Sequence, residues 1–594
     1  MKQRLGVVLG MVIAVLAVAL GLSGPATAAS DASISATKLE KNVKAAQKKA
    51  KKTCKKAKKV SKSKKATKKA KKKAKKSCAK AKKNSKRLSK KLKTFNAQYF
   101  DVCKHGCKYK TIQDGANAAG VWQKKNPKRD ATVRVQPGTY VEGVLLRGKL
   151  EGRDYNDLTI MGVKKDKTPN PNAQAVILEG TDAQTILKGN EPTWREGDAE
   201  VTPANNAIDA EDIDGLVLKN MWGRHYHNNT FFIWASNVPA DNSHCADFVM
   251  DNLVSSDTRS YGLFSRNCFG GQFTNSEGWN HGDSALYIGE TPCDSLDWNN
   301  HGDGTVPCQK DPKWTLVDNF KSHQNTLGYS GTNSKYVKIQ NSSFYNNGAG
   351  IVPNTLDSEH FGPSGWMILE NNDIFWNNYN YYQGFAGGSE FETVSNGLGE
   401  IVPGVNVNYP TGIGVVLYGT DGIVTRNNNI FGNEKWGAMA FSGPLGANKF
   451  DDAKNLNNQF IDNNLGRGGL DPNGVDFLDD HTGGGSCYQN NGPNPTYVIN
   501  SDAVPADEIY PKTCPQPVAL NKDTSSIDIS GANIQADEGF DGDDPNTVLG
   551  YAAANPPASM ECSWKKPAGG HPAFTDAKGQ TFVEKRTNPY TNCP

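Results

Sequence analysis

The amino-acid sequence predicts an all-β solenoid, in which short strands stack in successive laps around one core. A short apolar strand followed by asparagine recurs between about residues 215 and 480. The shortest steps between these asparagines, 22 and 23 residues, fall in the range typical of solenoid repeats. The apolar runs are too short for helices and rich in Val, Ile, Phe and Tyr. One such unit cannot bury its own apolar face, so neighbouring units must stack.

The asparagine that follows each strand suits a tight corner. It tolerates the left-handed backbone conformation, and its amide can bond to the copies above and below. The alternative is that asparagine is simply common in turns. Its fixed place after a strand favours a stacked ladder of amides. The eight asparagines are Asn220, Asn252, Asn275, Asn319, Asn341, Asn371, Asn427 and Asn463.

The segment before the repeat reads as a capping helix followed by a first strand. Residues 109–119 are Tyr-Lys-Thr-Ile-Gln-Asp-Gly-Ala-Asn-Ala-Ala, and residues 132–142 are Thr-Val-Arg-Val-Gln-Pro-Gly-Thr-Tyr-Val-Glu. Residues 283–290, within the repeat, are Asp-Ser-Ala-Leu-Tyr-Ile-Gly-Glu. Over about residues 100 to 490 the chain resembles the right-handed parallel β-helix proteins of the pectin-lyase-like superfamily. The resemblance implies this fold. It implies no single activity, because the superfamily hosts lyases, hydrolases, epimerases and adhesins.

Residues 1–28 have the organisation of a secretory signal. Lys2 and Arg4 precede an apolar run over 5–22, and residues 26–28, Ala-Thr-Ala, offer a cleavage site. The alternative is a membrane anchor, but the small residues lie at cleavage distance from the apolar run. No other apolar run is long enough to span a bilayer. We therefore expect a mature chain without a transmembrane segment that is secreted, extracellular or associated with the cell wall.

Residues 29–94 form a Lys/Ala-rich arm that we expect to be helical, and Cys54 with Cys78 could clamp it as a hairpin. Residues 41–93 hold 28 of the 68 basic residues and none of the 61 acidic ones, so a cationic arm precedes an acidic body. The arm suits attachment to an anionic cell-wall polymer or surface. The alternatives are a solvated spacer and an arm folded onto its own body. Export makes any attraction to nucleic acid incidental, so no specific nucleic-acid partner is expected.

The solenoid is expected over residues 95–490, and residues 491–594 read as an irregular, disulfide-containing C-terminal cap. Twelve cysteines in an exported chain indicate disulfides, and nearest-neighbour pairing is the simplest expectation. A zinc site is the alternative at Cys103 and Cys107, although only His105 lies between them. The expected pairs are Cys54–Cys78, Cys103–Cys107, Cys245–Cys268, Cys293–Cys308, Cys487–Cys514 and Cys562–Cys593.

Long inserts follow the second strand of several units, and they should form a wall of loops beside one face of the solenoid. A groove beside such a wall suits an extended polysaccharide. Side chains that point outward from this face could be platforms for sugar rings, or could pack beneath the loops. The inserts lie near 235–246, 291–313, 353–364, 384–412 and 444–457. The expected outward positions are Phe264, Tyr287, Tyr329, Val352, Tyr382 and Met439.

Polar residues near this face suggest proton-transfer chemistry on uronate glycans. A lyase or C5-epimerase needs a base, an acid and a cation that neutralises the carboxylate. We expect His281 as base, Tyr287 as acid and Arg259 as carboxylate clamp, with Asp283 beside them. Ordinary polarity in a Gly/Asn-rich turn is the alternative for each. The expected substrate-binding residues are Phe264, Arg266, Glu290, Tyr329, Tyr382, His225 and His227, and Glu359 and His360 lie on an insert.

Several motifs of related enzymes are absent from the sequence. There is no aspartate cluster with Gly-His-Gly and Arg-Ile-Lys, no Arg-x-Pro-x-x-Arg and no Asp-Pro-His-Asp. A non-catalytic adhesin or wall-associated glycan-binding protein is therefore the alternative function. Two acidic groups could hold Ca²⁺ or could be solvated turns. They are Asp471, Asp476, Asp479, Asp480 and His481, and Asp541, Asp543 and Asp544.

Overall fold

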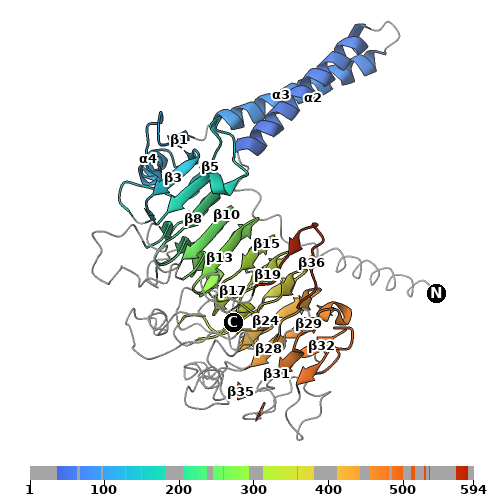
Figure 1. The fold of residues 1–594 in the computed structure, drawn as a ribbon. Coiled ribbons are helices and arrows are strands. Elements are labelled where there is room, and N and C mark those ends of the chain that lie inside the picture. Colours follow the sequence, from blue (N-terminus) through green and yellow to red (C-terminus); the bar gives the residue numbers. More distant parts are fainter. Residues whose placement is uncertain are drawn as a thin grey trace, which may run out of the picture. The chain divides into compact units, whose positions relative to one another are not determined.

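The computed structural model of the chain falls into two units, one of residues 1–98 with 128–130 and the other of 99–127 with 131–594 (Figure 1). No helix in the described part of the chain is long and apolar enough to cross a membrane. The predicted signal, residues 1–28, lies outside that part. The structure describes residues 36–62, 67–94, 98–127, 129–148, 150–180, 205–236, 245–258, 260–292, 312–356, 359–379, 411–441, 455–479, 484–498, 510–515, 528–529, 534–535 and 570–585.

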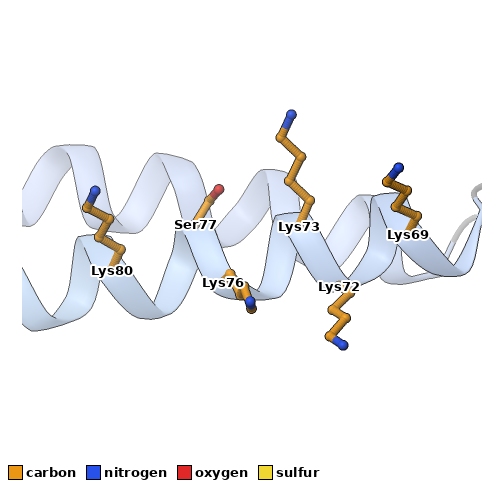
Figure 2. Close-up of a pocket in the computed structure, with 6 residues that line it drawn as sticks. All are labelled: Lys69, Lys72, Lys73, Lys76, Ser77 and Lys80. Carbon is orange, nitrogen blue, oxygen red and sulfur yellow. The ribbon is translucent and has the colours of Figure 1, made fainter.

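The first unit is a helical hairpin. Helices α2 (Ala36–Lys62) and α3 (Lys68–Thr94) pack along one another, and the Cys54–Cys78 disulfide joins them. Alanine and lysine are strong helix formers, but lysines one turn apart repel each other. The disulfide offsets this repulsion by holding the two helices together. Lysine side chains leave α3 in several directions, with Lys72 and Lys73 on opposite sides (Figure 2).

The second unit is a right-handed parallel β-helix, which confirms the predicted fold class. A lap contains three strands, as in β12 (Gln272–Thr274), β13 (Glu277–His281) and β14 (Ser284–Gly289). Each strand pairs in parallel with its counterpart one lap later. The first and second strands of the laps form one 20-stranded sheet, and the third strands form an 11-stranded sheet. The core lies between these sheets.

The third strands are β4 (Val144–Arg147), β7 (Ile208–Glu211), β9 (Phe231–Trp234), β11 (Leu263–Arg266), β14, β17 (Leu327–Thr332), β20 (Ala349–Asn354), β24 (Ile413–Tyr418), β28 (Trp436–Phe441), β31 (Val475–Asp479) and β33 (Tyr497–Val498). The first strands are β1 (Gln98–Val102), β2 (Ala131–Val135), β5 (Thr159–Gly162), β12, β15 (Thr315–Asp318), β18 (Val337–Gln340), β22 (Ile368–Glu370), β26 (Val424–Arg426), β29 (Gln459–Ile461) and β32 (Cys487–Gln489). The second strands are β3 (Gly138–Val141), β6 (Val176–Glu179), β13, β16 (Lys321–His323), β19 (Ser343–Tyr345), β23 (Asp373–Phe375), β27 (Asn429–Phe431) and β30 (Asn464–Leu465), and β8 (Val217–Arg224) and β10 (Val249–Thr258) span both rows.

Both ends of the solenoid are covered. Helix α4 (Ile112–Lys125) begins at the N-cap Thr111, whose hydroxyl accepts from the backbone N–H of Asp114, and its apolar face is buried against the first laps. Tyr510 packs on Tyr488 and Tyr497 at the last laps. Among the described residues of the predicted C-terminal cap, Tyr497 and Tyr510 thus lie at the end of the coil.

A hairpin of β36 (Phe574–Thr575) and β37 (Thr581–Phe582) lies along the side of the solenoid instead. Its Phe574 and Phe582 pack against Phe375 of β23. The remaining short elements are β21 (Ser364–Gly365), β25 (Thr420–Asp421), β34 (Asp528–Ile529), β35 (Ile534–Gln535), η1 (Ala173–Ala175) and η3 (Gly466–Gly469).

The first corner of the lap follows the predicted asparagines closely. Seven of the eight have the left-handed conformation, with φ between 51° and 59°. In the last of these laps Asp462 takes this conformation, and Asn463 is the residue after it. Corner amides bond directly between some laps, as from Asn252 to Asn220 at 2.8 Å. The fully stacked ladder, however, is built one residue further on. Its members are Asn372, Asn428, Asn463 and Asn491, with Nδ2–Oδ1 distances of 2.8 to 3.0 Å.

A second ladder of asparagines lies at the next corner, and the sequence analysis did not predict it. Each amide donates to the next lap at 2.9 to 3.1 Å, and the side chains are buried. Most of its members stand six residues after a corner asparagine, and this constant offset can be found in the sequence. The ladder consists of Asn325, Asn347, Asn377, Asn433 and Asn473.

Four of the six expected disulfides are described, and all four have the nearest-neighbour pairing: Cys54–Cys78, Cys103–Cys107, Cys245–Cys268 and Cys487–Cys514. The Cys103–Cys107 disulfide excludes a zinc site formed by these two thiolates. The pairs Cys293–Cys308 and Cys562–Cys593 lie outside the described residues.

Replacing an amide in the second ladder should destabilise the solenoid. In Asn377→Ala, the backbone N–H and the side-chain amide of Asn347 both lose the buried oxygen that they share. Each unsatisfied buried group costs about 1–3 kcal/mol, so we expect a loss of at least about 2 kcal/mol in the free energy of unfolding. Denaturant unfolding measures this loss. Asn464→Ala, at an exposed amide, is the matched control and should stay within about 0.5 kcal/mol of the native protein. Equal stability of the two variants would contradict the ladder's role.

Candidate functional site

A row of aromatic rings lies on the outer face of the 11-stranded sheet. Phe232, Phe264 and Tyr287 occupy equivalent places on β9, β11 and β14, because alternate residues of a strand point to the same face. The ring centroids of Phe232 and Phe264 are 4.3 Å apart, and those of Phe264 and Tyr287 are 4.6 Å apart. Trp234 stacks on Phe232 at 5.7 Å. Phe264 and Tyr287 are buried, whereas Phe232 and Trp234 are half-buried and reach solvent.

The outward prediction for Tyr329 is wrong. Tyr287 pairs with Ser330, and Tyr329 pairs with Leu286 at an inward position. The corner that precedes β17 is one residue shorter than the corner that precedes β14, which moves Tyr329 into the core. Its ring is fully buried, and its hydroxyl lies 3.0 Å from that of Ser334.

Further along this face the outward side chains pack beneath other residues. Val352 and Met439 do point outward, but they belong to a buried apolar cluster with Val416 and Leu478. At these two positions the outward side chains are therefore part of a buried cluster and are not exposed platforms for sugar rings. Tyr382 lies outside the described residues, as does Arg259, the expected carboxylate clamp. Four of the predicted inserts leave the third-strand sheet after β9, β14, β20 and β28, whereas the fifth, near 384–412, precedes β24.

Arg266, Glu290 and His360 form an ionic group beside the aromatic row. Arg266 donates from Nε and Nη2 to the two oxygens of Glu290, at 2.8 and 3.0 Å. The backbone N–H of His360 donates to Glu290 at 3.3 Å, and its Nδ1 lies 3.2 Å from the same oxygen. Burial alone would raise the pKa of Glu290, but the hydrogen bonds from His360 and Arg266 hold it below its ordinary value. Glu290 is thus a buried, ionised carboxylate that orients a cation and an imidazole.

Glu359 differs from Glu290 in its protonation. The hydroxyl of Tyr287 donates to the Glu359 carboxyl group, with both oxygens at 2.7 Å. Burial raises the pKa of Glu359 to about 8, and the charge of nearby Glu290 adds to the effect. Asp283, in the corner before β14, contributes in the same direction. At neutral pH Glu359 is a protonated acid beside an ionised carboxylate, and two carboxyl groups held in different protonation states can divide the roles of acid and base.

Tyr287 keeps its proton in this environment. Burial, reinforced by the charge of Glu359, raises the pKa of Tyr287 well above its ordinary value. Its hydroxyl is committed to the Glu359 carboxyl group, so the expected acid serves here to position another acid.

His281 does not face this site, contrary to its predicted role as base. It is fully buried inside the solenoid, where Nε2 lies 2.8 Å from the Ser255 hydroxyl and Nδ1 lies 2.6 Å from the Thr258 hydroxyl. Burial lowers the pKa of His281 to about 3. It stands six residues after Asn275, in the place that Asn325 takes one lap later, and its backbone N–H donates to Asn325. His281 therefore belongs to the second ladder.

The remaining predicted histidines lie in the corner between β8 and β9. His225 is buried, and its Nδ1 lies 2.6 Å from Glu179. His227 is half-buried in the same corner. The structure thus brings together Phe264, Arg266, Tyr287 and Glu290, with Asp283 nearby, and leaves His225 and His227 outside this group.

Phe232 and Trp234 were not among the residues predicted from the sequence. They stand 32 residues before Phe264 and Arg266, the same step that separates Asn220 from Asn252, so the repeat could have found them. An aromatic ladder on the outside of the second strands, four residues after the corner asparagines, was not predicted either. Its members are Trp279, His323, Tyr345, Phe375 and Phe431, with centroids 4.9 to 5.6 Å apart.

The calcium expectation for residues 471–481 is not supported by the carboxylates that are described. Asp471 contacts His571, Asp476 accepts from Thr496, and Asp479 accepts from Tyr488. These bonds direct the three carboxylates to separate partners. Asp480, His481 and the group of Asp541, Asp543 and Asp544 lie outside the described residues.

The fold should lose stability as the protonated Glu359 titrates. Its folded pKa of about 8 lies above the ordinary 4.5, so the stabilisation is complete below about pH 4.5 and is lost as the pH rises through about 8. The glutamine in Glu359→Gln stays neutral at every pH. The free energy of unfolding of this variant should therefore decline less between about pH 5 and pH 9 than that of the native protein, and the two declines should differ by at least about 1 kcal/mol. Denaturant unfolding at both pH values measures this. Glu151→Gln, at an exposed carboxylate, should retain the native pH dependence, and an unchanged decline in Glu359→Gln would exclude Glu359 as its source.

No protein-family model matches the chain, and no curated protein matches it. Among solved structures, the chain is similar to the Azotobacter vinelandii mannuronan C-5 epimerase AlgE4 A-module, with 12% identity over 67% of this chain and 86% of that one, at a TM-score of 0.37. It is also similar to the catalytic domain of a GH87 alpha-1,3-glucanase, with 11% identity over 68% of each chain and a TM-score of 0.35. A third is the periplasmic alginate epimerase AlgG, with 12% identity over 62% of this chain and 74% of that one, at a TM-score of 0.29. Similarities with identities and TM-scores this low do not indicate an activity for this chain.

Proposed function

We propose that this protein acts on an extended, acidic polysaccharide bound along the outer face of β4 to β14, as a lyase or C5-epimerase of uronate residues. The observation that carries the proposal is the arrangement at the end of the aromatic row, where Glu359 accepts from the Tyr287 hydroxyl beside the group of Glu290, Arg266 and His360. Burial raises the pKa of Glu359 in this place, which favours its protonated form. A proton donor held in this state is what β-elimination and epimerisation both need.

The surface beside Glu359 suits a sugar chain. Phe232 and Trp234 stack with their planes only 7° apart and reach solvent, so they offer a flat apolar surface to sugar rings. Arg147 of β4 and Arg266 of β11 flank them, and each is about one-third exposed. A guanidinium has five N–H donors, so Arg266 can bind a uronate carboxylate while it remains bonded to Glu290. Arg147 is already paired with Asp209 and Glu211, so Arg266 is the cation through which this strip would favour an acidic glycan over a neutral one.

His360 supplies the complementary base. Nδ1 of His360 lies 3.2 Å from Glu290, an ionised carboxylate that can only accept, so Nδ1 carries the proton in this contact. As a base, the imidazole would take a proton on Nε2. His360 would remove the C5 proton of a uronate whose carboxylate is neutralised by Arg266. Glu359 would then protonate the leaving oxygen in a lyase, or C5 from the opposite face in an epimerase. Tyr287 holds Glu359 in place for either step.

The second candidate function is that of a wall-associated protein that only binds glycan, for which the lysine-rich hairpin would be the attachment. Helices α2 and α3 present lysines on several sides, as α3 shows in Figure 2, and a surface of one charge attracts anionic polymers. Such a tether serves a secreted enzyme and an adhesin equally well. Activity on uronate polymers therefore separates the two functions.

Removing the acid should abolish catalysis and spare binding. Purified protein with a panel of uronate polymers should give the ultraviolet absorbance of unsaturated uronates, or proton exchange without cleavage. Glu359→Gln should lower the rate by at least about a hundredfold, because it cannot donate the proton. Trp234→Ala should instead weaken binding about tenfold, or about 1.4 kcal/mol, with little change in kcat. Glycan binding without either signal in the native protein would support the adhesin, and full activity in Glu359→Gln would reject this site.

Deleting residues 30–93 should weaken retention on anionic cell wall. The hairpin binds through charge, so retention of the native protein should fall steeply as salt is raised to about 0.5 M, because the ions screen the lysines. Sedimentation with cell-wall fragments at low and high salt measures this. The shortened protein should show low retention at both. Undiminished, salt-sensitive retention after the deletion would place the attachment elsewhere.

A further inference from the structure

Four ionisable side chains from distant parts of the sequence meet on the side of the solenoid. Glu434 follows β27, Asp471 lies just before β31, and His571 and Glu584 flank the C-terminal hairpin β36–β37. Nε2 of His571 lies 3.2 Å from Glu434 and 3.7 Å from Glu584. His571, Glu434 and Asp471 are almost fully buried, and Glu584 is 13% exposed. This cluster plays no part in the proposed glycan site.

Asp471 fixes the orientation of the imidazole. Its Oδ1 lies 2.5 Å from Nδ1 of His571, and its Oδ2 accepts from the indole N–H of Trp376 at 2.8 Å. A carboxylate on one ring nitrogen is the arrangement that directs the other nitrogen to a metal ion. Here the other nitrogen, Nε2, points at the carboxylates of Glu434 and Glu584.

The spacing of these ligand atoms matches a coordination sphere. Zinc binds imidazole nitrogen and carboxylate oxygen at about 2.0–2.2 Å, so tetrahedral geometry places two ligand atoms about 3.3–3.5 Å apart. The observed separations of 3.2 and 3.7 Å lie close to this value, and one atom from each of the three side chains lies within 4.8 Å of the others. We propose that Glu434, His571 and Glu584 bind a divalent transition-metal cation of the Zn²⁺ class, which fastens residues 570–585 to the solenoid.

The charge of the cluster supports a dication. Three carboxylates surround a single imidazole in a buried place, and buried charge is costly unless it is compensated. One nitrogen with two carboxylate oxygens suits Zn²⁺ better than Ca²⁺, which takes six to eight oxygen ligands. The site also lies where the C-terminal hairpin attaches to the solenoid. Phe574 and Phe582 of the hairpin pack against Phe375, and His571 and Glu584 lie on either side of them in the sequence.

Metal titration of the full chain tests the proposal. After treatment with a chelator, the native protein should bind one Zn²⁺ in calorimetry, and Co²⁺ in its place should give the visible absorption bands of a tetrahedral site with a nitrogen ligand. Glu584→Gln should weaken Zn²⁺ binding at least about tenfold, because it removes one of three protein ligands. Glu277→Gln is the matched control, since Glu277 pairs with His323 at 3.1 Å and no third ligand group joins them among the described residues, and it should bind Zn²⁺ as the native protein does.

The cobalt spectrum of the native protein decides the matter even if Glu584→Gln fails to fold. A native protein that binds neither metal, or a Glu584→Gln variant with the affinity of the control, overturns the proposal. In that case His571 is an imidazolium held by carboxylates. Loss of stability as the pH rises through about 9 would then be expected, because burial, which lowers the pKa of His571, is outweighed by the hydrogen bonds that its imidazolium donates to Asp471 and Glu434, which raise the pKa to about 9.

Discussion

Hydrogen bonding between laps is the constraint on which the rest of the molecule depends. Parallel strands satisfy the backbone along each face, but a corner would bury amides and carbonyls without strand partners. The side chains of Asn325, Asn347, Asn377 and Asn433 satisfy that demand, since each donates to the asparagine of the next lap and to a backbone carbonyl of the preceding lap. Their spacing fixes which residue of one lap lies over which residue of the next.

The candidate site inherits its geometry from this register. Phe232, Phe264 and Tyr287 form a row only because three successive laps are aligned residue for residue. The acid comes from a different source, because Glu359 reaches Tyr287 from an insert 72 residues further along the chain. The rigid sheet thus supplies the binding surface, while the loop supplies the group that changes its protonation.

The fold could be predicted from sequence because an asparagine recurs at the first corner of each lap and so reveals the length of the repeat. Seven of eight were found where expected, and the same periodicity contained the second ladder and the outer aromatic ladder at offsets of six and four residues. The site was harder to predict. Tyr329 was predicted to point outward, but the corner before it is one residue shorter than in the preceding lap, so it points inward. His281 was predicted to be a catalytic base, but it takes the place of a ladder asparagine inside the core. The raised pKa of Glu359 depends on its burial and on the charges of Glu290 and Asp283, surroundings that no repeat encodes.

The first corner of the lap has consequences for how this protein can diversify. From β12 to β30, the first and second strands are joined by two residues in every lap, whereas the chain between the second strand and the following first strand varies widely in length. New segments can therefore be inserted before or after a third strand without disturbing the asparagine ladder at the first corner, between the first and second strands. A lineage built on this plan could exchange its loops, and with them its chemistry, while the scaffold remained the same.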